Sequence, residues 1–127
     1  MLTALGARLG TKFMPSAVQL PEGGHVEVDG VDQTGGVYVE ALAHQGPPKG
    51  GQIRKVIMDA FKLAFLARAR PGAKMILLFS DPAAAAPFTS KRWFAQALRQ
   101  LGLQVEVVDV PEEMKARLIA AQKRQYR

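Results

Sequence analysis

Residues 26–43 read VEVDGVDQTGGVYVEALA and decide how the first half of the chain folds. Apolar and polar residues alternate in 25–32 and again in 37–43, which is typical of half-buried β-strands. Gly35 and Gly36 stand between the two segments and mark a tight turn. The stretch therefore predicts a β-hairpin.

The hairpin brings two acidic residues together. With a two-residue turn at Thr34-Gly35, the numbers of paired residues add up to 69, so Asp29 lies opposite Glu40 on one face and Val28 points to the other. Directly paired Cβ atoms are roughly 4.5–5.5 Å apart, and like charges at that distance destabilise a sheet. Either a cation lies between the carboxylates, or both are exposed at a sheet edge and paired with Lys or Arg.

Of these two alternatives, a bound divalent cation is the one that would imply a chemical function. Carboxylate oxygens are the ligands that hard ions such as Mg²⁺, Mn²⁺ or Ca²⁺ prefer. An ion held in this way can activate water and stabilise developing charge in phosphodiester hydrolysis. The spacing thus makes Asp29 and Glu40 candidate metal ligands.

The rest of the chain predicts helices alternating with strands. We expect a short helix at 2–10, strands at 17–20, 74–79 and 104–110, a long helix at 52–69, a loop at 80–90, a helix from the cap Ser90 to 101, and a last helix from Pro111. Alternating strands and helices favour an α/β sandwich with a mixed sheet. The 127 residues are expected to form a single domain.

This order of elements over residues 1–80 resembles the core of the PD-(D/E)XK nuclease superfamily, the restriction-endonuclease-like fold. In that superfamily an Asp ends the second core strand, and the third strand carries Glu-x-Lys. Asp29 matches the Asp, and Glu40-Ala41-Leu42 matches the second motif except that Leu42 stands in place of the Lys. The resemblance implies a central mixed sheet flanked by helices, with residues 90–127 as a carboxyl-terminal extension, and a metal bound by Asp29, Glu40 and the Ala41 carbonyl.

The motif Lys orients or helps to activate the attacking water, and some superfamily members carry it on the neighbouring helix. Gln52 and Lys55 lie three residues apart on one face of the long helix, and Asp59 and Lys62 extend that stripe. The resemblance implies that Lys55, or Lys49 in the preceding loop, replaces the lost Lys and that Gln52 orients water or substrate. Alternatively, the stripe is the solvated side of an amphipathic helix.

Basic residues concentrate in the second part of the chain. Residues 1–48 hold two basic and five acidic groups, a net charge of −3, whereas residues 49–127 hold fifteen and six, a net of +9. A basic surface suits nucleic acid, here expected to be DNA. The candidate phosphate contacts are Lys49, Lys91, Arg92, Lys123 and Arg124, with Arg127 and Tyr126 beside the last two. Ordinary solvation of helix faces and ends explains the same residues equally well.

Two further residues have alternative interpretations. His44 follows the second hairpin strand on the Glu40 face, where it acts on water or phosphate, or else hydrogen-bonds at the strand end. Asp81 precedes Pro82 after a buried strand, and the Asp-Pro pair favours turn chemistry over an additional metal ligand.

Several classes are excluded or disfavoured. The chain has no Cys, which excludes disulfides, thiol catalysis and thiolate metal sites. It lacks the glycine motifs of P-loop and dinucleotide-binding proteins and the GxSxG of hydrolases. We expect no signal peptide or membrane span and a cytoplasmic location. The absence of Cys and Asn, with abundant Ala, Leu and Arg, indicates a thermophilic or GC-rich source.

The sequence therefore predicts a nuclease that depends on Mg²⁺ or Mn²⁺ and acts on nucleic acid. A homodimer is expected, because cutting two strands needs two sites. Two alternatives remain open: a non-catalytic nucleic-acid-binding or interaction module that kept the nuclease fold but lost the motif Lys, and an enzyme acting on small phosphorylated molecules.

Overall fold

A computed structural model describes residues 1–125. The helices are α1 (Leu2–Leu9), α2 (Gly50–Ala69), α3 (Pro82–Ala85), the 3₁₀ turn η1 (Ala86–Thr89), α4 (Trp93–Gln100) and α5 (Glu112–Gln125). The strands are β1 (Phe13–Gln19), β2 (His25–Asp32), β3 (Val37–Leu42), β4 (Lys74–Phe79) and β5 (Leu103–Val107). Within these residues no helix is long and apolar enough to cross a membrane.

The five strands form one mixed sheet, arranged in the order in which they occur in the chain. The first three strands form an antiparallel meander, and β4 and β5 add to it in parallel. Parallel neighbours need a crossover, and these crossovers are α2 and the α3–η1–α4 segment. The protein therefore has the expected α/β architecture with a central mixed sheet.

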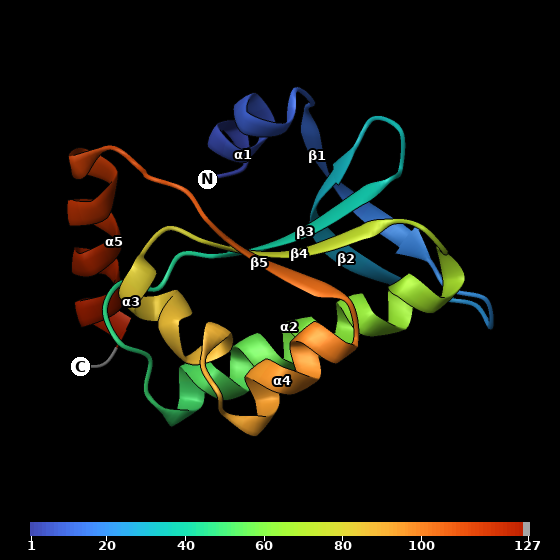
Figure 1. Ribbon diagram of the computed structural model, residues 1–127. Coiled ribbons are helices and arrows are strands. Elements are labelled where there is room, and N and C mark those ends of the chain that lie inside the picture. The colour runs from blue at the N-terminus through green and yellow to red at the C-terminus, as the bar shows by residue number, and fades with distance from the viewer. Residues whose placement is uncertain (126–127) are drawn as a thin grey trace.

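Helices cover both faces of the sheet, with α1 on one side and α2 and α4 on the other (Figure 1). The central strand β4, KMILLF, is buried on both faces, as its continuous apolar run predicts. On the α1 face Leu5 packs with Val39 and Ile76. On the α2 face Leu63 packs with the opposite side of β4.

Helix α2 is amphipathic, and its buried side packs against the sheet. Its fully buried positions recur at helical spacing: Val56, Ala60, Leu63 and Leu66. The next residue after the helix, Arg70, bonds the Tyr38 hydroxyl, and Pro71-Gly72 prevents continuation. The polar stripe that starts at Gln52 therefore runs along one flank of this buried side.

The β2–β3 hairpin has the register that its sequence predicts. Gly30 pairs with Val39 and Val31 with Tyr38, so paired numbers add up to 69. The turn itself differs from the expected one. The Gly35 N–H donates to the Asp32 carbonyl, which makes Gln33 and Thr34 the central residues. The Asp32 carboxylate also accepts hydrogen bonds from the amides of Gly36 and Val37, and this closes the turn.

A β-bulge interrupts the pairing of β1 with β2. The pairs on either side of it are Met14 with Val31 and Ser16 with Val28. One residue of β1, Pro15, therefore opposes two residues of β2, Asp29 and Gly30. Proline has no N–H to give to a ladder, so it is found at bulges and edges. Gly30 is also closely covered, because an added Cβ would lie 2.9 Å from a methyl group of Leu2 in α1, which would have to shift.

Because of the bulge, the expectation about the direction of Val28 is wrong. Val28 does not point away from the face of Tyr38 and Leu42, but packs with both of them in the core beneath α2. The extra residue in β2 shifts the alternation of side chains, because successive residues alternate only while the strand is regular. Bulges commonly re-aim a side chain in this way.

Other differences concern element boundaries. β1 begins at Phe13, earlier than expected, and the expected loop at 80–90 contains α3 and η1. Asp81 caps α3, since its carboxylate accepts from the Ala83 amide. Ser90 does not begin α4: its hydroxyl donates to the Pro87 carbonyl and ends η1, and α4 starts at Trp93.

Burial along α2 makes a prediction about stability. Leu63 is fully buried, whereas Phe61 on the same helix is 73% exposed. Leu63→Ala should lower the free energy of unfolding by about 2–5 kcal/mol because it leaves a cavity. Phe61→Ala removes a larger side chain but should cost less than about 1 kcal/mol. Urea titration of both variants checks this, and equal losses would contradict the described orientation of α2.

Candidate functional site

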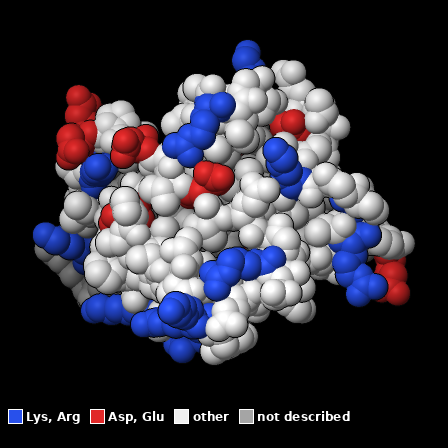
Figure 2. All heavy atoms as spheres, viewed as in Figure 1, with Lys and Arg blue, Asp and Glu red and all other residues white. Residues whose placement is uncertain are grey.

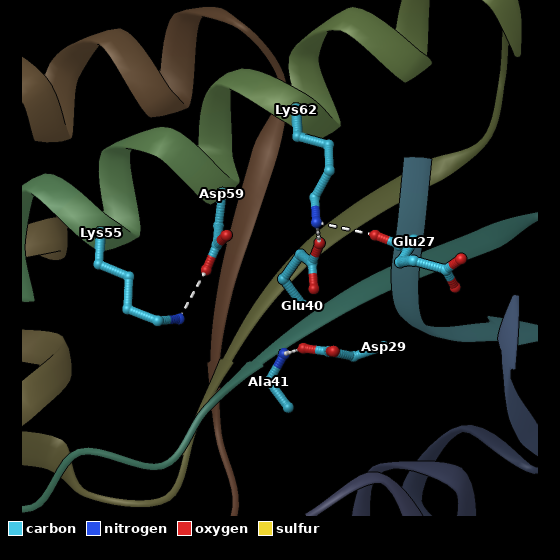
Figure 3. Close-up of polar contacts among 7 residues, drawn as sticks. All are labelled: Glu27, Asp29, Glu40, Ala41, Lys55, Asp59 and Lys62. Atoms are coloured by element: carbon cyan, nitrogen blue, oxygen red, sulfur yellow. Dashed lines mark hydrogen bonds and ion pairs between the residues drawn. The ribbon is translucent and has the colours of Figure 1, made fainter. Parts of the chain in front are cut away.

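The Asp29 and Glu40 carboxyl groups lie next to each other on neighbouring strands (Figure 3). Glu40 comes from the middle of β3 and Asp29 from the bulge in β2. Glu40 is 2% exposed, whereas Asp29 is exposed to solvent. One carboxylate thus lies inside the protein and the other at its surface.

The backbone between these strands opens at the same point. The described β2–β3 pairs end at Gly30 with Val39. Beyond them the Ala41 amide donates to Oδ2 of Asp29, at 2.9 Å, instead of to a strand carbonyl. The amide and carbonyl of one residue point to the same side of an extended strand, so the Ala41 carbonyl also faces β2. Three oxygen-bearing groups therefore surround the gap.

Glu40 is not an ordinary carboxylate. Burial and, to a smaller extent, the neighbouring Asp29 carboxylate together raise its pKa from 4.5 to about 7, against the opposite effect of Lys62. Desolvation disfavours the charged form because a low-dielectric interior cannot replace water. Without a bound cation, Glu40 therefore takes up a proton at near-neutral pH.

Lys62 of α2 is the cation that contacts Glu40. Its ammonium forms an ion pair with Oε1 of Glu40 and donates to the Glu27 carbonyl at 2.8 Å (Figure 3). Oε1 is buried, and the Lys62 ammonium is the group that compensates its charge. The Lys62 side chain is 26% exposed, so this ion pair lies near the surface.

The residues proposed from sequence to replace the motif Lys lie elsewhere. Lys55, about two turns before Lys62, forms an ion pair with Asp59 at 3.3 Å (Figure 3). Gln52 accepts from the Lys49 amide at the start of α2. None of Lys49, Gln52 and Lys55 contacts Glu40. Together with His44 they line a separate cavity.

Lys62 was in the sequence stripe, but its role was not predicted. Residues 52, 55, 59 and 62 share one flank of α2, so the stripe alone does not show which of them reaches Glu40. The seven residues 43–49 carry the chain beyond the end of β3 before α2 turns back. Lys62 follows Gly50 by about 18 Å of helix, which returns it to the middle of the strand.

The candidate nucleic-acid contacts do not form one site with the carboxylates. All five are exposed: Lys49, Lys91, Arg92, Lys123 and Arg124. Lys91 and Arg92 precede α4, and Lys123 and Arg124 lie in the last turn of α5. Tyr126 and Arg127 lie outside the described residues. Nε2 of the exposed His25 lies 3.2 Å from Oε1 of Glu27.

The described residues offer few side-chain ligands for a metal ion. Between residues 1 and 125 no three His, Cys, Asp or Glu side chains are placed to hold one ion. Asp81 is engaged in capping α3 and is not a third ligand. If a hard cation were bound by the two carboxylates and the Ala41 carbonyl, water or substrate would have to fill its remaining positions, as is common for Mg²⁺.

The raised pKa of Glu40 makes a prediction about stability. Folded Glu40 keeps its proton up to about pH 7, whereas the unfolded chain releases it near its ordinary pKa of 4.5. Unfolding should therefore become easier as pH rises between these values, by up to about 3 kcal/mol, with no further loss above pH 7. Glu40→Gln should remove this fall. Urea unfolding in EDTA across that range measures it.

The control for this measurement is Glu27→Gln. Glu27 is on the neighbouring strand with a side chain that is 74% exposed. This variant should keep the pH dependence of the wild-type protein. A Glu40→Gln variant with an unchanged pH dependence would show that Glu40 titrates normally.

Comparisons with known proteins identify no relative. The chain matches no protein-family model, no curated protein and no solved structure with significance. The chemistry of the site therefore rests on its residues and their geometry.

Proposed function

We propose that this protein is a divalent-metal-dependent nuclease that hydrolyses phosphodiester bonds in nucleic acid. The observation that carries the proposal is the adjacent pair Asp29 and Glu40, of which one is buried with a raised pKa and contacts a lysine. A perturbed carboxylate beside a charge partner is a common property of functional sites. Acids placed only for solubility have no reason to be buried.

The residues fit a hard cation. Oε1 of Glu40 contacts the Lys62 ammonium, so a cation would be held by the other Glu40 oxygen together with Asp29 and the Ala41 carbonyl. An oxygen donor set of this kind suits Mg²⁺ or Mn²⁺. A bound ion would supply a polarised water and compensate charge on the phosphate.

Lys62 takes the role that the sequence assigned to Lys55 or Lys49. Its ammonium is fixed by Glu40 and the Glu27 carbonyl, and an ammonium has three donors, so one remains for a phosphate oxygen or a water. A preorganised donor directed at the place where charge develops stabilises the transition state. Asp29 is at the surface, on the side of the site from which the substrate would approach.

The order of elements supports a restriction-endonuclease-like assignment. The chain runs α1, three antiparallel strands, α2 and the parallel β4, with the acids on β2 and β3. The motif Lys is replaced by Leu42, and the structure offers Lys62 from the following helix. The exposed Lys91, Arg92, Lys123 and Arg124 are proposed phosphate contacts, and a homodimer would present two sites to a duplex.

Cleavage assays test this proposal. With Mn²⁺ or Mg²⁺ the wild-type protein should cut plasmid or single-stranded DNA and lose activity in EDTA. Asp29→Ala and Glu40→Gln should reduce the rate by at least about 10²-fold, and Lys62→Ala by about 10²–10³-fold, the range for one lost electrostatic donor. Lys74→Ala, at an exposed position at the start of β4, is the matched lysine control and should keep full activity.

Metal binding is read out separately from cleavage. Calorimetry at pH 8 should show one Mn²⁺ site that is absent in Asp29→Ala and Glu40→Gln. No metal-dependent cleavage of DNA or RNA, together with no metal binding, would contradict the proposal and favour a non-catalytic binding module.

A further inference from the structure

The cavity lined by Lys49, Gln52 and Lys55 is separate from the carboxylate pair. It has a volume of about 580 Å³ and lies where β3 ends and α2 begins, with α5 across its other side (Figure 1). Ligand-binding clefts commonly have volumes of 300–1,000 Å³. The proposed hydrolysis at Asp29 and Glu40 does not use this space.

The inner wall of the cavity is apolar. Leu42 from β3, Val56 from α2 and Phe79 from β4 are each at most 5% exposed and form its floor. Leu118 and Ala121 of α5 line the opposite side. An uncharged aromatic or aliphatic group would gain free energy by moving from water to this apolar wall.

The outer part of the cavity is cationic. Lys49 and Lys55 line it beside His44, and none of the described residues that line it is acidic. Asp59 holds the Lys55 ammonium but lies outside the lining, and an ammonium keeps two further donors. Figure 2 shows Lys and Arg side chains gathered along the lower left edge, where α2 begins and α5 ends. An anion is the charge type that fits this end.

Amide groups lie between the apolar and the cationic parts. Gln52 contributes a side-chain amide whose oxygen accepts from the Lys49 backbone, which leaves its NH₂ available for a ligand. Gln122 of α5 bonds both backbone groups of Gln45, at 2.9 Å each, and fixes α5 across the cavity. The Gln52 NH₂ is therefore the donor that a hydrogen-bonding atom on the flat part of a ligand would use.

We infer that this cavity binds a nucleoside phosphate, with the base on the apolar floor and the phosphate at Lys49 and Lys55. An anion at one end, an apolar face and a hydrogen-bonding edge are all properties of a nucleotide. The choice of a nucleotide over other phosphorylated compounds rests on the proposed function. Lys55 and Lys62 lie on one flank of α2, about 10 Å apart along the helix. The bound nucleotide is therefore either part of a nucleic-acid strand that continues to Glu40, or a free nucleotide bound beside that site.

Calorimetry in EDTA tests the inference without cleavage. Deoxyadenosine monophosphate should bind once per chain, and deoxyadenosine and inorganic phosphate should each bind at least about tenfold more weakly. Lys55→Ala should weaken binding about tenfold or more, whereas Lys74→Ala, which removes the same charge far from the cavity, should leave it within twofold. Equal binding of the nucleotide and inorganic phosphate would overturn the inference.

A bulky substitution on α5 provides a second, charge-free test. Ala121 is exposed and lines the cavity, so Ala121→Trp should fill it without disturbing the core and should abolish nucleotide binding. Ala120→Trp, one position earlier and outside the lining, should bind like the wild-type protein. Unchanged binding by Ala121→Trp would overturn the inference.

A terminally phosphorylated single-stranded oligonucleotide distinguishes the two sources of the ligand. If the oligonucleotide alone binds, and Ala121→Trp abolishes that binding, the site holds a strand end; if the free nucleotide binds as well, it is a nucleotide site. If neither binds, the inference is wrong. Asp29→Ala should bind the nucleotide normally, so failure of the proposed cleavage and failure of this inference give different results.

Discussion

The site depends on the burial of Glu40 beneath α2. A carboxylate with 2% exposure is costly unless it is neutralised, and here the Lys62 ammonium and a raised pKa share that task. Replacing a buried ion pair with apolar residues is often neutral or stabilising by about 1–4 kcal/mol. Stability alone therefore does not explain Glu40. Its cost is understandable if a cation or substrate is bound beside it, which is the basis of the proposed function.

Asp29 reaches Glu40 through a defect in the sheet. Pro15 cannot donate to a ladder, and β2 accommodates it with the two-residue bulge of Asp29 and Gly30. The bulge shifts the alternation of β2, so that Val28 joins the core under α2 and the Asp29 carboxylate bonds the Ala41 amide. A single proline in β1 thus helps to open the ladder at the candidate site. Gly30 permits the close approach of α1 over the same bulge.

Sequence patterns predicted those features of the fold that depend on interactions between residues close together in the chain. The hairpin register, α2 and the buried β4 follow from alternation, helical spacing and an apolar run, and the structure contains all three. The bulge, the α3 helix and the partner of Glu40 depend on other things. The first arises from a proline on a different strand, the second from an Asp81 cap in a segment with the composition of a loop, and the third from the length of the 43–49 connection. None of these is encoded in the spacing of the acids.

One argument explains both why Leu42 stands at the position of the motif Lys and why Lys62 contacts Glu40. Leu42 occupies the position of the motif Lys, and its side chain is 5% exposed in the floor of the cavity, next to Val56 and Phe79. A lysine there would place its stem and charge in an apolar wall, at a large desolvation cost. Lys62 approaches Glu40 from α2 instead and stays 26% exposed. In the proposed nuclease, moving the cation from β3 to α2 preserves a charge beside the carboxylates and leaves the end of β3 apolar for a base.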